Sequence, residues 1–506
     1  MSSSPARATL ATLTLLSAIA CARPPRLAAD LIVTHANIWT GDPTQPDAGA
    51  LAVIGERIVD VGGVDAIDRW RGANTTVVDA GGRRLVPGFN DAHVHVVEGG
   101  TDLDTVDLKD AGSVAEFARR INERAKAKPG EWILGGHWDD RRWSPASLPT
   151  RALIDDVTNS SPVFVLRYDG RAALANSAAL GRAGITERTA DPAGGGMVRD
   201  VNGFPTGVLT GTAMDIVAQV IPKMTADQRL HAVKRTLELA ASLGITSLQD
   251  MHASYDDIAA YAELANRGEL TARVYAAPAE GGWYDQAKLG VHRAFGSPWL
   301  RIGAVQADGS GIRASEELRT RLMAADHAEL QLCVDVPADG GARPVLDLFD
   351  SVARANGGRD RRFRMERALR LAPGDADRVA ALNAIASIQP EEEGAVNGLR
   401  ALADKGVRLA LGSGWPAAPL NPMLTLSTMT AHRLTVAEAL SAHIVGSTFA
   451  EFQEGEKGTI ARGKLADVII LSDDILSIPP AQIKDVRVLT TIVGGRIVHQ
   501  RKPQNE

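Results

Sequence analysis

The chain of 506 residues is too long for one small core and has room for one large barrel domain plus a smaller unit. Hydrophobic residues make up 45% and charged residues 23%, which is ordinary for a soluble globular protein. The formal net charge is -6 and no long run of Lys or Arg occurs, so the composition argues against a nucleic-acid partner.

The N-terminus has the pattern of an export signal. Arg7 precedes the apolar run LATLTLLSAIACA, which is long enough for a signal-peptide core but short for a membrane span. We therefore expect residues 1–22 to be a signal peptide and the protein to be exported, either periplasmic or secreted. Cys21 also resembles a bacterial lipoprotein site, so the alternative is a lipid anchor at Cys21, which would be the protein's contact with a membrane. Without this leader Cys333 is the one cysteine left, which excludes an internal disulfide.

Short β-type segments occur at both ends of the chain. LIVTHANIWTG, LAVIGERIVDVGG and TTVVDAGGRRLVPG lie near the N-terminus, and GKLADVIILSDD and VRVLTTIVGGRIVHQ lie near the C-terminus. Several of these runs end at Gly, as strands that lead into turns do. The pattern predicts one small composite β-sandwich built from residues 30–88 and 455–503.

Helix-like and strand-like segments alternate between these two ends. Thr225 and Gln228 form a capping-box pattern before a helix, Gly244 ends that helix, and the strand ITSLQDM follows. The helix DDIAAYAELANRG comes next, and Pro344 is well placed to begin a later helix. Repeated strand-then-helix units imply a parallel sheet, and this many of them favour an α/β fold of the (β/α)8 TIM-barrel type over residues 89–450.

The stretch VPGFNDAHVHV places two histidines at the end of the first expected barrel strand. His93 and His95 are two residues apart, so in a strand both side chains point to the same face. In such barrels the chemistry sits at the carboxyl ends of the strands. Two convergent imidazoles suggest a metal site, but a catalytic zinc site normally has three protein ligands and an open position for water.

Several motifs together resemble the amidohydrolase superfamily. They are LVPGFNDAHVH, WILGGHWDD, LPTRALIDDV, GITSLQDM, GVRLALGS and EKGTIARGKLADVIIL, and they span nearly the whole chain after residue 30 in the right order. The branch that they resemble most is similar to N-substituted formamide deformylases. The resemblance implies a distorted (β/α)8 barrel with a composite β-sandwich. It also implies hydrolysis of C–N bonds in small amides by a metal-activated hydroxide.

The resemblance further implies a metal site, and most of its ligand positions are substituted in this chain. The family uses two histidines on strand 1, a lysine on a middle strand, one histidine on each of strands 5 and 6, and an aspartate on strand 8. His93 and His95 match the strand-1 pair. Asp335, Arg367 and Gly414 stand at the positions of strands 5, 6 and 8, and the segment GAVQADG contains no lysine.

Arg367 argues most strongly against a bound metal. A fixed positive charge about 4 Å from a divalent ion costs roughly 8 kcal/mol at an effective dielectric constant of ~20. We therefore expect an amidohydrolase-family protein that has lost the usual metal-dependent hydrolysis, a pseudoenzyme that binds an unidentified small molecule, with no cofactor and with catalytic residues unknown. The alternative is an active hydrolase with an altered single zinc site made of His93, His95 and a carboxylate such as Asp335.

Other residues could contribute to the site. We expect Arg367 to occupy the position of the missing cation and to pair with Asp335 through a fork of hydrogen bonds. His137 in GGHWDD and His252 in DMHAS lie near expected strand ends, where they could be recruited as ligands or be ordinary hydrogen-bonded residues. Trp138 and Trp415 could line a pocket or pack in the core.

Overall fold

The computed structural model describes residues 27–502 except 159, 338–340, 369–370, 373 and 391–397. The predicted signal peptide and the lipid-anchor alternative at Cys21 lie outside the described residues. Within the described part of the chain, no helix is long and apolar enough to cross a membrane.

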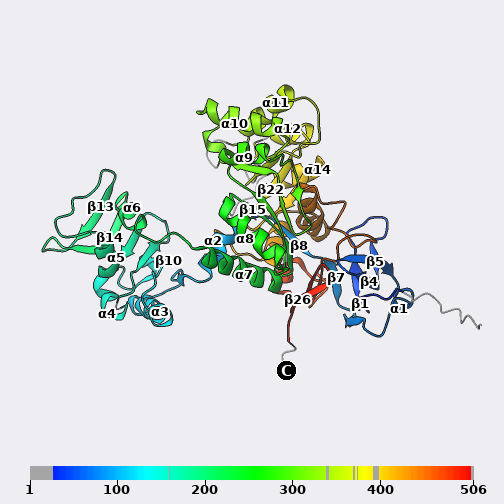
Figure 1. The fold of residues 1–506 in the computed structure, drawn as a ribbon, viewed down its shortest axis with the longest axis horizontal. Coiled ribbons are helices and arrows are strands. Elements are labelled where there is room, and N and C mark those ends of the chain that lie inside the picture. The colour runs from blue at the N-terminus through cyan, green and yellow to red at the C-terminus, as the bar shows by residue number, and fades with distance from the viewer. Residues whose placement is uncertain are drawn as a thin grey trace, which may run out of the picture.

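Two five-stranded sheets of mainly parallel strands form the centre of the molecule (Figure 1). The first has the order β17 (Phe295–Gly296), β18 (Leu300–Ile302), β16 (Arg273–Ala277), β15 (Ile245–Met251) and β8 (Phe89–Val94). The second has the order β19 (Ala304–Ala307), β20 (Gln331–Asp335), β21 (Arg364–Glu366), β22 (Ile385–Ile388) and β23 (Arg408–Leu411). The chain is therefore a mixed α/β protein, and the two sheets are not joined by continuous strand pairing.

Isolated parallel bridges nevertheless connect the two sheets. Val94 at the end of β8 bridges to Trp415, which follows β23, and Ala279 after β16 bridges to Gln306 in β19. The carboxyl ends of the parallel strands of both sheets are brought together in this way.

Helices follow most of the parallel strands, as the alternation in the sequence predicted. They are α7 (Ala226–Ser242), α8 (Tyr255–Asn266), α9 (Trp283–Lys288), α10 (Glu316–His327), α11 (Arg343–Ala355), α12 (Asp375–Ala381), α14 (Leu399–Asp404), α15 (Pro422–Ala431), α16 (Val436–Ser441) and α17 (Ser447–Ala450). The predicted capping box is confirmed: Thr225 and Gln228 exchange side-chain and backbone hydrogen bonds at the start of α7. Pro344 lies in the first turn of α11, also as predicted.

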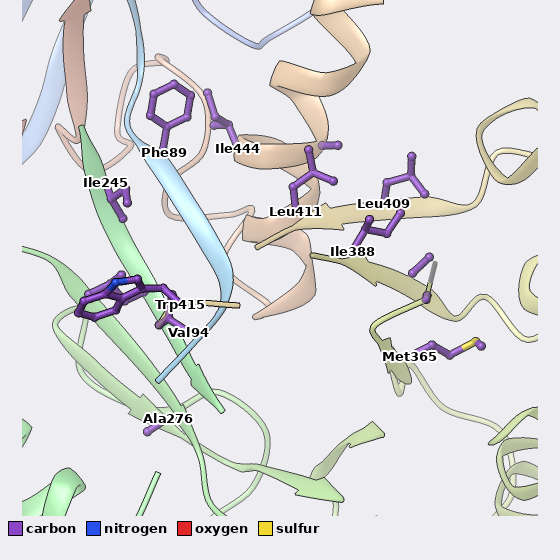
Figure 2. Close-up of a cluster of buried hydrophobic side chains, with 14 of the residues drawn as sticks. Phe89, Val94, Ile245, Ala276, Met365, Ile388, Leu409, Leu411, Trp415 and Ile444 are labelled. Carbon is purple, nitrogen blue, oxygen red and sulfur yellow. The ribbon is translucent and has the colours of Figure 1, made fainter. Parts of the chain in front are cut away.

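One large apolar core holds the strands and these helices together (Figure 2). Phe89, Ile245, Ile388 and Leu411 come from four different parallel strands and are all fully buried. Burial of a side chain of this size contributes about 1.5–3 kcal/mol. The core therefore fixes the strand ends, where the histidines of β8 lie.

Strands from the two ends of the chain share one sheet. Its order is β26 (Arg496–Gln500), β25 (Val488–Val493), β24 (Val468–Leu471), β7 (Arg84–Pro87), β2 (Asn37–Trp39) and β3 (Asp47–Ala48). A second sheet has the order β5 (Arg57–Gly62), β4 (Ala50–Ile54), β1 (Leu31–Thr34) and β6 (Thr76–Asp79), with α1 (Val64–Asp68) beside it. The pairing of β7 with β24 joins segments almost 400 residues apart.

A third unit interrupts the span that the sequence assigned to the barrel. We call it the insert, residues 106–218, and it lies to one side of the parallel sheets in Figure 1. Its sheet has the order β13 (Gly195–Arg199), β14 (Pro205–Gly211), β12 (Ala172–Ala175), β11 (Phe164–Arg167), β10 (Gly135–Trp138) and β9 (Val106–Asp107). Its helices are α3 (Val114–Ala127), α4 (Asp155–Thr158), α5 (Ser177–Arg182) and α6 (Ala213–Ala218). The helix α2 (Val96–Asp102) leads from β8 to the insert.

Candidate functional site

His93 is fully buried in β8 and is held by a carboxylate from another strand. Its Nδ1 lies 2.9 Å from Oε2 of Glu366, the last residue of β21. The backbone N–H of His93 donates to Oδ1 of Asp91, which also accepts from the N–H of Ser413 at 2.9 Å. The histidine is therefore fixed both at its backbone and at one ring nitrogen.

Arg364 completes this arrangement, and the sequence analysis did not identify it. It is fully buried in β21, and its Nε lies 2.7 Å from Oε1 of Glu366. Its guanidinium also donates to the carbonyl oxygen of Ala92 at 2.6 Å and to the side chain of Gln249. The spacing of Arg364 and Glu366, two residues apart in one strand, was a usable signal, because both side chains must face the side on which His93 lies.

His95 lies beside His93 at the start of α2. The two rings meet edge to face with their centroids 5.4 Å apart, as the two-residue spacing predicted. His95 Nδ1 is 2.8 Å from the carbonyl oxygen of Met251, so this contact engages Nδ1 and does not involve Nε2. Burial and the charge of His93 lower the pKa of His95 to about 4, so this ring is neutral near pH 7.

Glu366 controls the charge at the buried end of the site. Burial alone would raise its pKa, but the charge of Arg364 and the hydrogen bond to His93 lower the pKa of Glu366 to about 2. Burial opposes the charged form of His93, yet the hydrogen bond and charge of Glu366 outweigh it and raise the pKa of His93 above its ordinary value. The three side chains thus form one buried charged cluster.

Arg367 does not pair with Asp335, so that prediction is wrong. Both residues are described, and no ion pair joins them in this part of the chain; one carboxylate oxygen of Asp335, Oδ1, has no hydrogen-bond partner there. The parallel register places Asp335 opposite Glu366, whereas Arg367 lies one residue beyond β21. Arg367 also has a φ of 55°, so the backbone leaves the extended conformation at this residue.

Arg367 still acts on the site through its charge. It lowers the pKa of His93, of His95 and of Asp335 relative to what burial and the other neighbours alone would give. Its backbone N–H donates to Oε1 of Gln389 at 2.9 Å. The charge of Arg367 therefore lies near His93, His95 and Asp335, although its predicted partner was wrong.

Gly414 has a backbone conformation that would be strained in most other residues. Its φ is 72°, in the left-handed region that glycine adopts without cost, and its N–H donates to the carbonyl oxygen of His93 at 2.9 Å. Asp tolerates this region better than most residues, so the backbone here suits either a glycine or an aspartate.

A pocket of about 1080 Å³ opens where the insert meets the parallel sheets. His95, His252 and Arg367 reach it from the strand ends, and His137 and Tyr168 reach it from the insert. His137 and His252 both have a φ of 62°, which is uncommon for residues other than glycine. Residues with such backbone conformations are found most often at functional sites. The pocket is large enough for a small organic ligand.

The two tryptophans are core residues. Trp138 is fully buried and stacks on Trp143 with ring centroids 6.1 Å apart. Trp415 is almost fully buried and packs against Gly99, where an added Cβ would lie 2.1 Å from its ring. Of the two alternatives for these residues, packing is the one that the structure supports.

Among the described residues, no group of three or more His, Cys, Asp or Glu side chains could hold a metal ion.

Comparison with known proteins agrees with the motifs. A family model described as "Amidohydrolase family" matches residues 76–499. Protein LONG AFTER FAR-RED 3 of Arabidopsis thaliana is 32% identical, over 94% of this chain and 92% of that protein. N-substituted formamide deformylase of Arthrobacter pascens is 23% identical, over 93% of this chain and 98% of that protein. The crystal structure of an uncharacterized metal-dependent hydrolase from Pyrococcus horikoshii has a TM-score of 0.72 at 21% identity, over 89% of this chain and 99% of that one.

Proposed function

The chain belongs to the amidohydrolase family, as its motifs predicted, and from that premise we propose that it is an exported small-molecule-binding protein that has lost the family's metal-dependent hydrolysis. The observation that carries the proposal is the charge of Arg367, which acts on His93, His95 and Asp335 together.

The donor set at this position suits a metal ion poorly. Among the described residues, His93 Nε2, one ring nitrogen of His95 and the carboxylate of Asp335 are the most that the site offers, because the lysine and the two other histidine positions of the family are substituted. A divalent ion there would face Arg367, at a cost of roughly 8 kcal/mol for a separation of about 4 Å and a dielectric constant of ~20. The residues present do not fit the family's metal centre, and we assign no catalytic step to a metal.

The two parallel sheets are proposed to be the halves of one (β/α)8 barrel. In support, the bridges Val94–Trp415 and Ala279–Gln306 connect the sheets at both sides. With these bridges included, eight parallel strands follow one another in the order β8, β15, β16, β19, β20, β21, β22 and β23, which is the sequential order of such barrels. The barrel would be residues 89–450 with the insert within it.

The remaining assignments rest on the sequence pattern. Residues 30–88 and 455–503 are proposed to form one β-sandwich domain, which the sheet shared by β7 and β24 supports.

Export of the protein is proposed from the apolar run after Arg7. The alternative is an exported protein with a lipid anchor at Cys21. Fractionation of expressing cells tests export: a protein that retains residues 1–22 and stays in the cytoplasm would contradict it.

A second candidate function is an active hydrolase with one metal ion on His93, His95 and Asp335, which would have to move closer together, because they do not form a metal-binding group in the described part of the chain. Two buried atoms favour it, because His93 Nε2 and Asp335 Oδ1 have no hydrogen-bond partner among the described residues. By family resemblance its substrates would be small amides with non-peptide C–N bonds, and zinc would be its metal.

Hydrolysis assays separate the two functions. N-substituted formamides, the substrates that the name of one relative indicates, are offered to the protein with and without added zinc. We expect no zinc-stimulated hydrolysis. Zinc-stimulated hydrolysis that disappears in His95→Ala but persists in His231→Ala, a change at an exposed histidine, would establish the second function instead.

A further inference from the structure

Three of the buried polar atoms that have no hydrogen-bond partner within the described part of the chain lie near the former ligand positions. They are His93 Nε2, Gln306 Oε1 and Asp335 Oδ1. His93 is 0% exposed and Gln306 is 2% exposed, while Asp335 is partly exposed but has its Oδ1 atom buried. Buried polar atoms in native proteins are almost always paired, and each unpaired one costs about 1–3 kcal/mol.

The three side chains are neighbours. Gln306 lies in β19 and Asp335 ends the adjacent parallel strand β20. Burial raises the pKa of Asp335 above its ordinary value, although the charge of His93 and a hydrogen bond from Gln306 act in the opposite direction, which places both side chains close to this carboxyl group. His93 and Asp335 do not form a direct ion pair in the structure, so a separation remains between their unpaired atoms.

The charges around these atoms restrict what can bind between them. A cation would be repelled by Arg367, whose charge acts on both His93 and Asp335. An anion would face the carboxylate of Asp335 and the amide oxygen of Gln306, which are both acceptors. A small neutral molecule that both donates and accepts hydrogen bonds meets neither obstacle.

We propose that one buried water molecule, hydrogen-bonded to His93 Nε2, Gln306 Oε1 and Asp335 Oδ1, occupies the place of the family's metal ion. Water offers two donors and two lone pairs, and buried waters typically make about 3 hydrogen bonds to polar atoms that would otherwise be unsatisfied. This inference rests on the proposed loss of the metal. It explains how histidine and carboxylate remain buried together without an ion between them.

A high-resolution crystal structure of the full protein, with anomalous diffraction data at the zinc edge, tests the inference. We expect a peak without anomalous signal, ~2.6–3.2 Å from each of the three atoms. An anomalous peak ~2.0–2.1 Å from His93 Nε2 would be zinc and would overturn both this inference and the proposed function. A metal-free centre in which no peak contacts the three atoms would overturn this inference alone.

Two substitutions at one position sharpen the test. Asp335→Asn retains an oxygen acceptor of the same size and should keep the water peak. Asp335→Leu removes the acceptor and should abolish the peak, while the unfolding midpoint shows that the variant is folded. A water peak that is unchanged in Asp335→Leu would contradict the site, and so would its loss in a folded Asp335→Asn protein.

Discussion

His93 Nδ1 and Glu366 Oε2 lie 2.9 Å apart, and both side chains are buried. On the other side of the same carboxylate, Arg364 Nε lies 2.7 Å from Oε1. A carboxylate in the core is tolerated only where positive groups surround it, and Arg364 with His93 supplies them here. The cluster therefore fixes the orientation of the first family histidine.

Arg364→Met should be strongly destabilising. It leaves Glu366 buried with its main cationic partner removed, which costs about 3–5 kcal/mol in comparable buried pairs. Urea unfolding followed by circular dichroism measures the loss. Arg235→Met removes an exposed partner of Glu238 and serves as the control, with an expected cost of about 0–1 kcal/mol. Equal costs for the two variants would show that Glu366 does not depend on Arg364.

Gly414→Asp should recover neither zinc binding nor hydrolysis. The substitution restores the aspartate of the family's strand 8, but Arg367 still repels a cation and the lysine and two histidine positions stay substituted. Because Asp tolerates a φ of 72° better than most residues, we expect the variant to remain folded. Zinc titration and amide hydrolysis of the purified variant check this, and measurable hydrolysis would mean that the site has been misread.

Asp467 should make the protein's stability depend on acid pH. Its carboxylate forms two contacts with Arg273, at 2.7 and 2.9 Å; burial would raise its pKa, but the charge and hydrogen bonds of Arg273 outweigh burial and lower it. A lowered pKa in the folded state contributes stability above the unfolded value of ~3.9, and this contribution is lost as the pH falls through the folded value. We expect Asp467→Asn to cost about 3–5 kcal/mol at pH 6 and progressively less below about pH 4.

The control for this prediction is Asp68→Asn, which removes an exposed partner of Arg71. It should cost about 0–1 kcal/mol at either pH. Unfolding free energies at several pH values give the comparison. A cost for Asp467→Asn that did not change between pH 6 and pH 3 would refute the role of the ionised carboxylate.

Gly100→Ala should destabilise α2, the helix that leads from β8 to the insert. A Cβ at Gly100 would lie 1.9 Å from the carbonyl oxygen of Ala232 in α7, so the two helices α2 and α7 would have to separate. Overpacking of this kind costs about 1–3 kcal/mol. Gly181 in α5 has open space around its Cβ position, so Gly181→Ala should instead stabilise by about 0.5–1 kcal/mol. The thermal unfolding midpoints of both variants test this prediction. A Gly100→Ala protein as stable as the unmodified protein would argue against the tight contact between α2 and α7.

Local patterns in the sequence predicted the local structure well. The capping box of α7, the proline at the start of α11 and the adjacent rings of His93 and His95 depend on residues close together in the chain. The spacing of Arg364 and Glu366 indicated a shared face, but the contacts of Arg364 with Ala92 and Gln249, 272 and 115 residues away, could not be predicted from local patterns.

One missed unit and one wrong prediction have physical reasons. The insert lies within the span of residues 89–450 and was not recognised as a separate unit, because its own sheet depends on long-range pairing. The pairing of Arg367 with Asp335 was inferred from adjacent strand ends, but the strand register and the turn at Arg367 decide which side chains meet. Neither the strand register nor the turn at Arg367 can be read from the sequence alone.

The metal content of the purified protein tests the central claim most directly. The full chain is purified without chelators, incubated with zinc, dialysed, and analysed by inductively coupled plasma mass spectrometry, with His93→Ala as a matched variant. Loss of the metal centre predicts far less than one zinc per chain and no difference between the two proteins. About one zinc per chain in the unmodified protein, lost in His93→Ala, would contradict the claim.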